Sequence, residues 1–301
     1  MLQLLQNNDL ILMEASIVES LRRSPDVSLD PVLVNAPLIY EETGRRMLAQ
    51  LYQSYIDIAA AAGTPFLMCT PTWRTSHARV TESGIRAQIN IDAVTFLRDL
   101  RGANAAWQGN IRIGGMIGCK NDCYMPEEAL SAADAEHFHD WQLGQLKRGG
   151  VDFLIAETLP NVQEAIGIAR AMEKTGLPYI ISFVISRDGR VLDSTSLETA
   201  MATVDAATHE NPLGFMVNCA YPSFLCAQSQ PPAVFDRLIG YQANASSLDH
   251  CDLDGADELH RESTAEWGRL MLSLNRDYDV KILGGCCGTG ARHLRYITQQ
   301  G

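Results

Sequence analysis

An alternation of short apolar runs with longer amphipathic stretches extends along nearly the whole 301-residue chain. Short apolar runs bounded by turn residues are typical of buried strands, and the longer stretches have helical periodicity. The expected strands are 10–13, 66–69, 111–117, 153–156, 179–185, 213–218, 239–242 and 280–284. After the first strand and residues 14–16, an amphipathic segment runs to about residue 23. The further expected helices are 40–62, 84–101, 131–148, 161–175, 195–208, 231–238, 256–276 and a last one from about 290. Eight such units predict a parallel sheet closed into a (β/α)8 TIM barrel.

Composition is consistent with one large domain. The chain is 46% hydrophobic and 20% charged, which is enough apolar material for a large core. Glycine and proline are scattered along the chain, so nothing indicates a linker. We therefore expect residues 1–301 to form a single domain.

Charge and hydropathy exclude several classes of partner. The formal net charge of −12 argues against nucleic acid and anionic membranes, because both are bound through basic patches. No apolar run approaches the ~20 residues of a membrane span, and the N-terminus lacks the pattern of a secretory signal. A cytoplasmic location is expected, where the eight cysteines serve metals or catalysis rather than disulfides.

Three cysteines follow apolar runs that are predicted to be strands. Cys286 and Cys287 lie in a glycine-rich turn after one strand, and Cys219 ends another. The carboxyl ends of barrel strands meet at one rim, so these thiols are expected to lie close together. A soft divalent metal needs about three protein ligands if one position is to stay open for a substrate. The pattern predicts an open zinc site with three thiolate ligands.

Other readings of these cysteines stay open at this stage. A free cysteine is commonly a small buried hydrophobe, and two adjacent cysteines form a disulfide or bind an iron–sulfur cluster in other proteins. A cluster needs a fourth thiolate, which only Cys226 or Cys251 would supply, from loops. The glycines on both sides of Cys286 and Cys287 favour the metal site, because packing alone does not require so permissive a backbone.

Two carboxylates are expected at the same rim. Glu14 follows the first predicted strand, and Glu157 ends the fourth. A carboxylate at the mouth of a barrel is costly unless it is paired. A pair of them suggests a cationic ligand such as an amino-acid ammonium group, and salt bridges to neighbouring basic side chains are the alternative.

The stretch from Gly284 to Thr289, with Asn218 and Cys219 upstream, resembles the homocysteine S-methyltransferase family. Members of that family are zinc-dependent thiol methyltransferases on a (β/α)8 barrel. The resemblance covers nearly the whole chain, although it is loose between motifs. It implies that the zinc ligands are Cys219, Cys286 and Cys287, and that Glu14 and Glu157 bind the amino group of homocysteine.

The same resemblance implies a substrate pocket and shows where this chain departs from the family. The further implied pocket residues are Ala15, Ser16, Thr72, Trp73 and Asn244. Glu14 stands where the family usually has aspartate, and Ala15 where it usually has glycine. A methyl group at Ala15 narrows the approach of a substrate carboxylate to the backbone N–H groups. The acceptor is therefore expected to be homocysteine or a similar thiol.

The expected reaction is methyl transfer between two small molecules. A thiol bound to zinc is a thiolate at neutral pH, and three cysteinates keep it electron-rich. The partner would be a sulfonium or quaternary ammonium donor, held against aromatic faces for which Trp73, Tyr124 and Phe183 are candidates. S-methylmethionine, S-adenosylmethionine and betaine remain open as donors, and the oligomeric state is not predicted.

Two alternative functions are compatible with the same residues. One is a redox-sensing or metal-sensing barrel in which Cys286 and Cys287 alternate between thiol and disulfide. The other is a barrel that binds zinc and a thiol without methyl transfer. Outside this site, we interpret Cys119 and Cys123 as idle thiols and His139 as a structural or rim residue. The acidic stretch 246–255 matches no motif.

Overall fold

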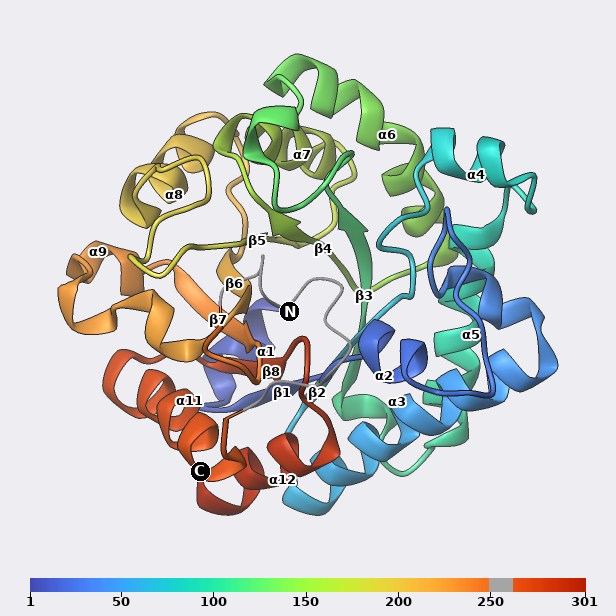
Figure 1. Ribbon diagram of the computed structural model, residues 1–301, viewed down its shortest axis with the longest axis horizontal. Coiled ribbons are helices and arrows are strands. Elements are labelled where there is room, and N and C mark those ends of the chain that lie inside the picture. Colours follow the sequence, from blue (N-terminus) through green and yellow to red (C-terminus); the bar gives the residue numbers. More distant parts are fainter. Residues whose placement is uncertain (249–261) are drawn as a thin grey trace.

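The computed structural model describes residues 1–248 and 262–301. Eight parallel strands form a closed barrel in chain order, with β8 paired to β1, and helices surround it (Figure 1). The strands are β1 (Ile11–Met13), β2 (Phe66–Cys69), β3 (Ile111–Gly118), β4 (Phe153–Leu159), β5 (Tyr179–Phe183), β6 (Gly214–Ala220), β7 (Leu238–Ala243) and β8 (Ile282–Gly285). The predicted (β/α)8 fold is confirmed.

Helices follow the strands around the outside of the barrel. The α-helices of the described residues are α1 (Leu2–Asn7), α2 (Val18–Arg22), α3 (Glu42–Ala62), α4 (His77–Ser83), α5 (Ile89–Ala103), α6 (Ala132–Gly149), α7 (Val162–Glu173), α8 (Leu197–Ala206), α9 (Pro232–Phe235), α11 (Thr264–Tyr278) and α12 (Ala291–Gln300). None of these helices is long and apolar enough to cross a membrane.

The strands alternate between two apolar layers. Ile11 and Met13 of β1 point into the barrel interior, whereas Leu12 packs outward beneath the helices. This period of two is what a strand buried on both faces requires. The short helix α1 was not predicted; it lies within the outline of the barrel in Figure 1, and its Leu5 packs against the interior layer.

Several predicted boundaries were wrong, and two of the errors have a common cause. Strands β4 and β6 extend beyond their predicted ends, to Leu159 and Ala220, because each continues past a β-bulge near its carboxyl end. Strand β5 is shorter than predicted and ends at Phe183. Helix α4 was missed, and α9 is a single turn of four residues. The start predicted for helix 256–276 lies outside the described residues.

Candidate active site

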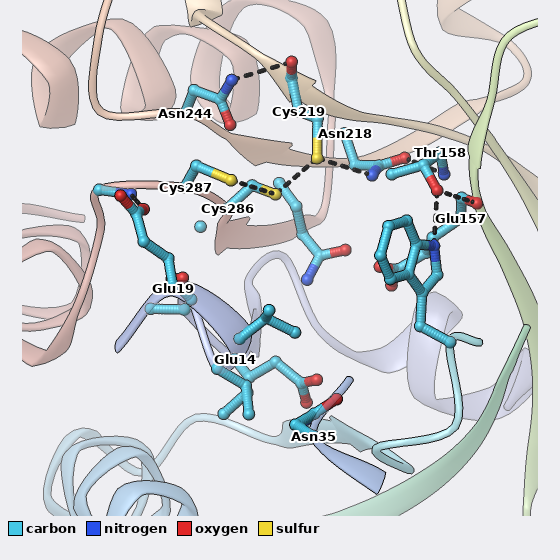
Figure 2. Close-up of a pocket in the computed structure, with 18 of the residues that line it drawn as sticks. Glu14, Glu19, Asn35, Glu157, Thr158, Asn218, Cys219, Asn244, Cys286 and Cys287 are labelled. Atoms are coloured by element: carbon cyan, nitrogen blue, oxygen red, sulfur yellow. Dashed lines mark hydrogen bonds between the residues drawn. The ribbon is translucent and has the colours of Figure 1, made fainter. Parts of the chain in front are cut away.

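The three predicted ligand cysteines converge at the carboxyl end of the barrel. Cys219 lies in β6, and Cys286 and Cys287 lie in the turn after β8. All three Sγ atoms lie within 4.8 Å of one another, with 2.6 Å between Cys219 and Cys286 and 4.0 Å between Cys286 and Cys287 (Figure 2). Among the described residues this is the one group of three or more His, Cys, Asp or Glu side chains placed to hold a metal ion.

The sulfur positions fit a tetrahedral metal site. With metal–sulfur bonds of about 2.3 Å, the sulfurs of such a site lie roughly 3.8 Å apart. The distance between Cys286 and Cys287 already matches, and the Cys219 to Cys286 distance must open by about 1 Å, which is within the range of side-chain rotation. All three are free thiols. Soft thiolates of this kind select zinc over hard cations such as magnesium.

A strained backbone aims Cys219 into the pocket. Its φ is +56°, in the left-handed region that non-glycine residues seldom adopt, and it lies at the bulge of β6. Two asparagines hold it there: Asn244 Nδ2 donates to the Cys219 carbonyl at 2.9 Å, and Asn218 Nδ2 donates to its Sγ at 3.3 Å. Strain of this kind persists where neighbouring contacts over-determine it, which is common at functional sites.

The neighbouring strands are tied to the same asparagine. Asn218 Oδ1 accepts hydrogen bonds from the Thr158 N–H at 2.9 Å and from the Ser182 hydroxyl at 2.7 Å. Thr158 also has a positive φ, of 59°, and its hydroxyl accepts from Trp73 Nε1 at 2.8 Å. The carboxyl ends of β4, β5 and β6 thus form one hydrogen-bonded unit behind the thiol of Cys219.

The turn after β8 is held through its backbone. Cys286 N–H donates to the Ala243 carbonyl, and the Cys287 carbonyl accepts from Ala245 N–H, both at 2.8 Å. Gly285 must be glycine, because a Cβ there would lie 2.2 Å from Thr289 Oγ1. Gly288 has a φ of +79°, so the turn also needs glycine at its end.

The thiols share their protons unequally. Hydrogen bonds to Cys286 and Cys287, followed by burial, raise the pKa of the Cys219 thiol. Hydrogen bonds from Cys219 and Cys286 lower the pKa of Cys287 well below its ordinary range. One thiolate is therefore stabilised by its two protonated neighbours, and three thiolates together require a positive charge at their centre.

The two predicted carboxylates are buried in the same pocket, with Glu14 3% and Glu157 8% exposed. Burial raises the pKa of Glu157 to about 8. Burial, with repulsion from Glu157, also raises the pKa of Glu14 well above its ordinary range, although Glu14 Oε2 accepts from Cys69 N–H at 2.6 Å. Neither pairs with a basic side chain in the described parts of the chain, and Glu157 Oε1 has no hydrogen-bond partner there. The pocket therefore presents two acids that a cation would satisfy.

We expect the buried Glu157 to make stability fall as the pH rises. In the folded state it keeps its proton up to about pH 8, whereas the unfolded chain releases it near 4.5. Its contribution is therefore fully present below pH 4.5 and is lost through this window, by about 1.4 kcal/mol per pH unit. Urea titrations of the metal-free, reduced protein between pH 5 and 7 should show a steeper loss for wild type than for Glu157→Gln. If the stability of wild type and of Glu157→Gln fell equally with pH, the raised pKa of Glu157 would be contradicted.

A cavity of about 230 Å³ connects the thiols with the acids. The predicted pocket residues that line it are Glu14, Ala15, Ser16, Trp73, Glu157 and Asn244. Thr72 does not line it: this residue is fully buried, and its hydroxyl donates to the Met116 carbonyl at 2.6 Å. Phe183 is also outside the cavity, stacked on Phe215 in the core, so it is not a donor-binding aromatic.

Polar residues that were not predicted also line the cavity, among them Glu19, Asn35 and Gln242. Gln242 is the second-last residue of β7, and its position as a polar residue after an apolar run was a signal that the sequence did offer. Asn35, labelled in Figure 2, belongs to a segment without periodicity, and Glu19 lies in the short helix α2. Only the tertiary structure brings these two to the pocket.

The remaining cysteines and histidine stay outside the metal group. Cys119 and Cys123 are both buried, with Cys123 lining the cavity, and no third ligand joins them among the described residues. Cys226 donates to the Arg187 carbonyl rather than joining the triad, and Cys251 lies outside the described residues. The structure thus offers no fourth thiolate for an iron–sulfur cluster within its described part. His139 is buried, 3.4 Å from the Glu164 carboxylate, in a structural position.

A (β/α)8 barrel with three convergent thiols at its carboxyl rim defines a metal-binding barrel protein. The chain belongs to the family described as Homocysteine S-methyltransferase, whose model matches residues 3–300. It is 28% identical to Homocysteine S-methyltransferase 4 of Zea mays over 57% of this chain and 51% of that protein. It is 25% identical to the S-methylmethionine–homocysteine S-methyltransferase BHMT2 of Rattus norvegicus over 53% of this chain and 47% of that protein. The matched part spans about half the length of these curated relatives.

The same barrel is found in solved structures of the homocysteine methyltransferase MmuM from Escherichia coli. Its metallated form superimposes with a TM-score of 0.76 at 18% identity, covering 99% of both chains. Its oxidized form gives 0.77 at 17% identity, covering 99% of this chain and 98% of that one. At 17–18% identity, this structural similarity supports the fold of the chain and nothing further.

Proposed function

We propose that this protein is a zinc-dependent methyltransferase that moves a methyl group from a sulfonium or quaternary ammonium donor to the thiol of homocysteine or a similar thiol. One observation carries the proposal: a single pocket holds three convergent thiols and two buried carboxylates without a cationic partner among the described residues. The thiols suit a soft metal, and the carboxylates suit an ammonium group. A thiol amino acid is the small molecule that satisfies both.

In this proposal Cys219, Cys286 and Cys287 hold the zinc ion. When bound, the ion supplies a Lewis acid that lowers the pKa of a substrate thiol to below neutrality. Asn218 donates to the Cys219 sulfur and Asn244 donates to the Cys219 carbonyl, so the two side chains fix this ligand through its thiol and its backbone. Outer hydrogen bonds of this kind orient the ligands of a metal site.

Glu14 and Glu157 orient the acceptor by its ammonium group. Glu14 is held by the Cys69 N–H, and the backbone of Glu157 lies in β4. The backbone N–H groups near Ala15 are less open to the substrate carboxylate than they would be with the glycine that the family usually has. Ala15 adds a methyl group, and the Ser16 N–H already donates to Thr289 Oγ1 at 3.3 Å. The amide side chain of Asn35 is a further polar group that lines the same cavity (Figure 2).

Trp73 and Tyr124 form the aromatic wall on which a cationic donor would lie. Trp73 is fixed by its bond to Thr158, and the Arg74 guanidinium lies 4.1 Å from the ring centroid of Trp73. We expect Trp73→Leu to raise the KM for the donor about 10-fold, since a cation–π contact contributes roughly 1–2 kcal/mol. Trp73→Phe should raise it less. Steady-state kinetics provide the check, with the KM for homocysteine as the internal control; equal changes in both constants would argue against a donor contact.

The cavity size favours a small donor. Pockets that enclose drug-sized ligands measure about 300–1,000 Å³, and the described residues leave about 230 Å³ here. S-methylmethionine and betaine therefore suit the space better than S-adenosylmethionine. S-methylmethionine is also the donor that the name of the rat relative states.

A donor screen tests the proposed function. The zinc-loaded, reduced protein would be incubated with homocysteine and each of the three donors, and methionine would be measured by mass spectrometry. Methionine formed from S-methylmethionine or betaine supports the proposal. No methylated thiol from any donor, in a protein that retains its metal, would contradict it and favour the sensor function.

A further inference from the structure

Glu19 of helix α2 joins the rim of the pocket to the turn that carries two of the three thiols. The Gly288 N–H donates to Glu19 Oε2. The other oxygen, Oε1, accepts from the Arg23 guanidinium at 3.1 and 3.2 Å. Among the described residues, Glu19 is the one charged side chain with a hydrogen bond to the backbone of Cys286, Cys287 or Gly288.

The contacts of the turn show why this bond matters. The backbone bonds of Cys286 and Cys287 run to Ala243 and Ala245, at the end of β7, and hold one side of the turn. The Gly288 N–H, at a residue with left-handed φ, faces the opposite side, where α2 lies. Because the turn carries two adjacent sulfurs, a small rotation of its backbone would move both relative to Cys219.

We propose that Glu19 is a positioning residue of the metal centre. Its carboxylate fixes the Cys286–Gly288 turn from the α2 side, so that two sulfurs stay aimed at the third. The hydrogen bond to Gly288 is largely shielded from water, because the Glu19 side chain is only 16% exposed. The Arg23 guanidinium binds the other carboxylate oxygen, Oε1, and not the oxygen that accepts from Gly288. This inference rests on the metal site of the proposed function, but not on methyl transfer.

Three variants separate the possible contributions of Glu19. Glu19→Ala removes the bond to Gly288, Glu19→Gln keeps an acceptor oxygen without the charge, and Arg23→Ala leaves the bond to Gly288 intact. The dissociation constants of Zn²⁺ and Co²⁺ would be measured by competition with a chromophoric chelator. The Co²⁺ absorption spectrum reports whether three thiolates still surround the ion. Circular dichroism of the metal-free variants confirms that each is folded.

We expect Glu19→Ala to weaken metal binding about 10- to 100-fold, as loss of an outer-shell partner does, and to alter the Co²⁺ spectrum. Glu19→Gln and Arg23→Ala should stay within about threefold of wild type, because both keep the hydrogen bond. Unchanged affinity in Glu19→Ala would overturn the proposal, and so would equal losses in Glu19→Ala and Glu19→Gln. Wild type that binds metal tightly but transfers no methyl group would defeat the proposed function and leave the role of Glu19 intact.

Discussion

Cys219→Ser and Cys286→Ser are each expected to reduce bound zinc from about one ion per chain to less than about a tenth. Methyl transfer should fall at least about 10³-fold with it, because a substrate thiol then lacks the Lewis acid that deprotonates it. A serine hydroxyl is a hard, neutral ligand at this position, and two remaining thiolates do not make a stable zinc site. Elemental analysis of the anaerobically purified, reduced proteins provides the measurement.

Cys226→Ser is the matched control for these variants. Its sulfur donates to the Arg187 carbonyl and is not one of the residues that line the cavity. The control should keep both zinc and activity. Full zinc and full activity in Cys219→Ser would exclude the ligand set of Cys219, Cys286 and Cys287.

Glu157→Gln is expected to lower kcat/KM for homocysteine about 2 × 10²- to 5 × 10³-fold. In the complex, the buried carboxylate pairs with the substrate ammonium, and removing one partner of a buried ion pair costs about 3–5 kcal/mol. The amide is nearly isosteric, so packing at the end of β4 is retained. The loss of kcat/KM should therefore depend on the presence of an amino group in the substrate.

A thiol without that amino group supplies the discriminating measurement. Wild type should prefer homocysteine over 4-mercaptobutanoate by a large factor, and Glu157→Gln should lose most of this preference. The double comparison isolates the interaction between carboxylate and ammonium. If Glu157→Gln slowed both thiols equally, Glu157 would not be the ammonium-binding residue.

The fold could be predicted because its pattern is local and repeated. Each strand is a short apolar run, and the eight alternations leave few architectures other than a barrel. The predicted strand ends were wrong where the backbone adopts a conformation that the residue type does not indicate. Thr158 and Cys219 adopt positive φ at bulges of β4 and β6 although neither is glycine, so no residue type at these positions indicates that the strands continue.

The candidate site was predictable where chemistry and strand ends coincide. Two adjacent cysteines among glycines, and a third at a strand end, indicate a metal site from residue types alone. Thr72 shows the limit of this reasoning, since a residue one step from Trp73 points into the protein rather than into the pocket. Asn35 comes from a segment with little periodicity, and Glu19 lies in a predicted helical stretch that does not by itself show which side chain faces the pocket. The positions of both follow from long-range packing.

The most direct test of a metal-dependent thiol methyltransferase is a cycle of zinc removal and replacement. Reduced protein would be depleted with a chelator, supplied with homocysteine and S-methylmethionine, and assayed for methionine before and after one equivalent of Zn²⁺ is added. We predict no methionine without zinc and recovery of activity with it. Methionine formed at an undiminished rate by the metal-free protein would contradict the account.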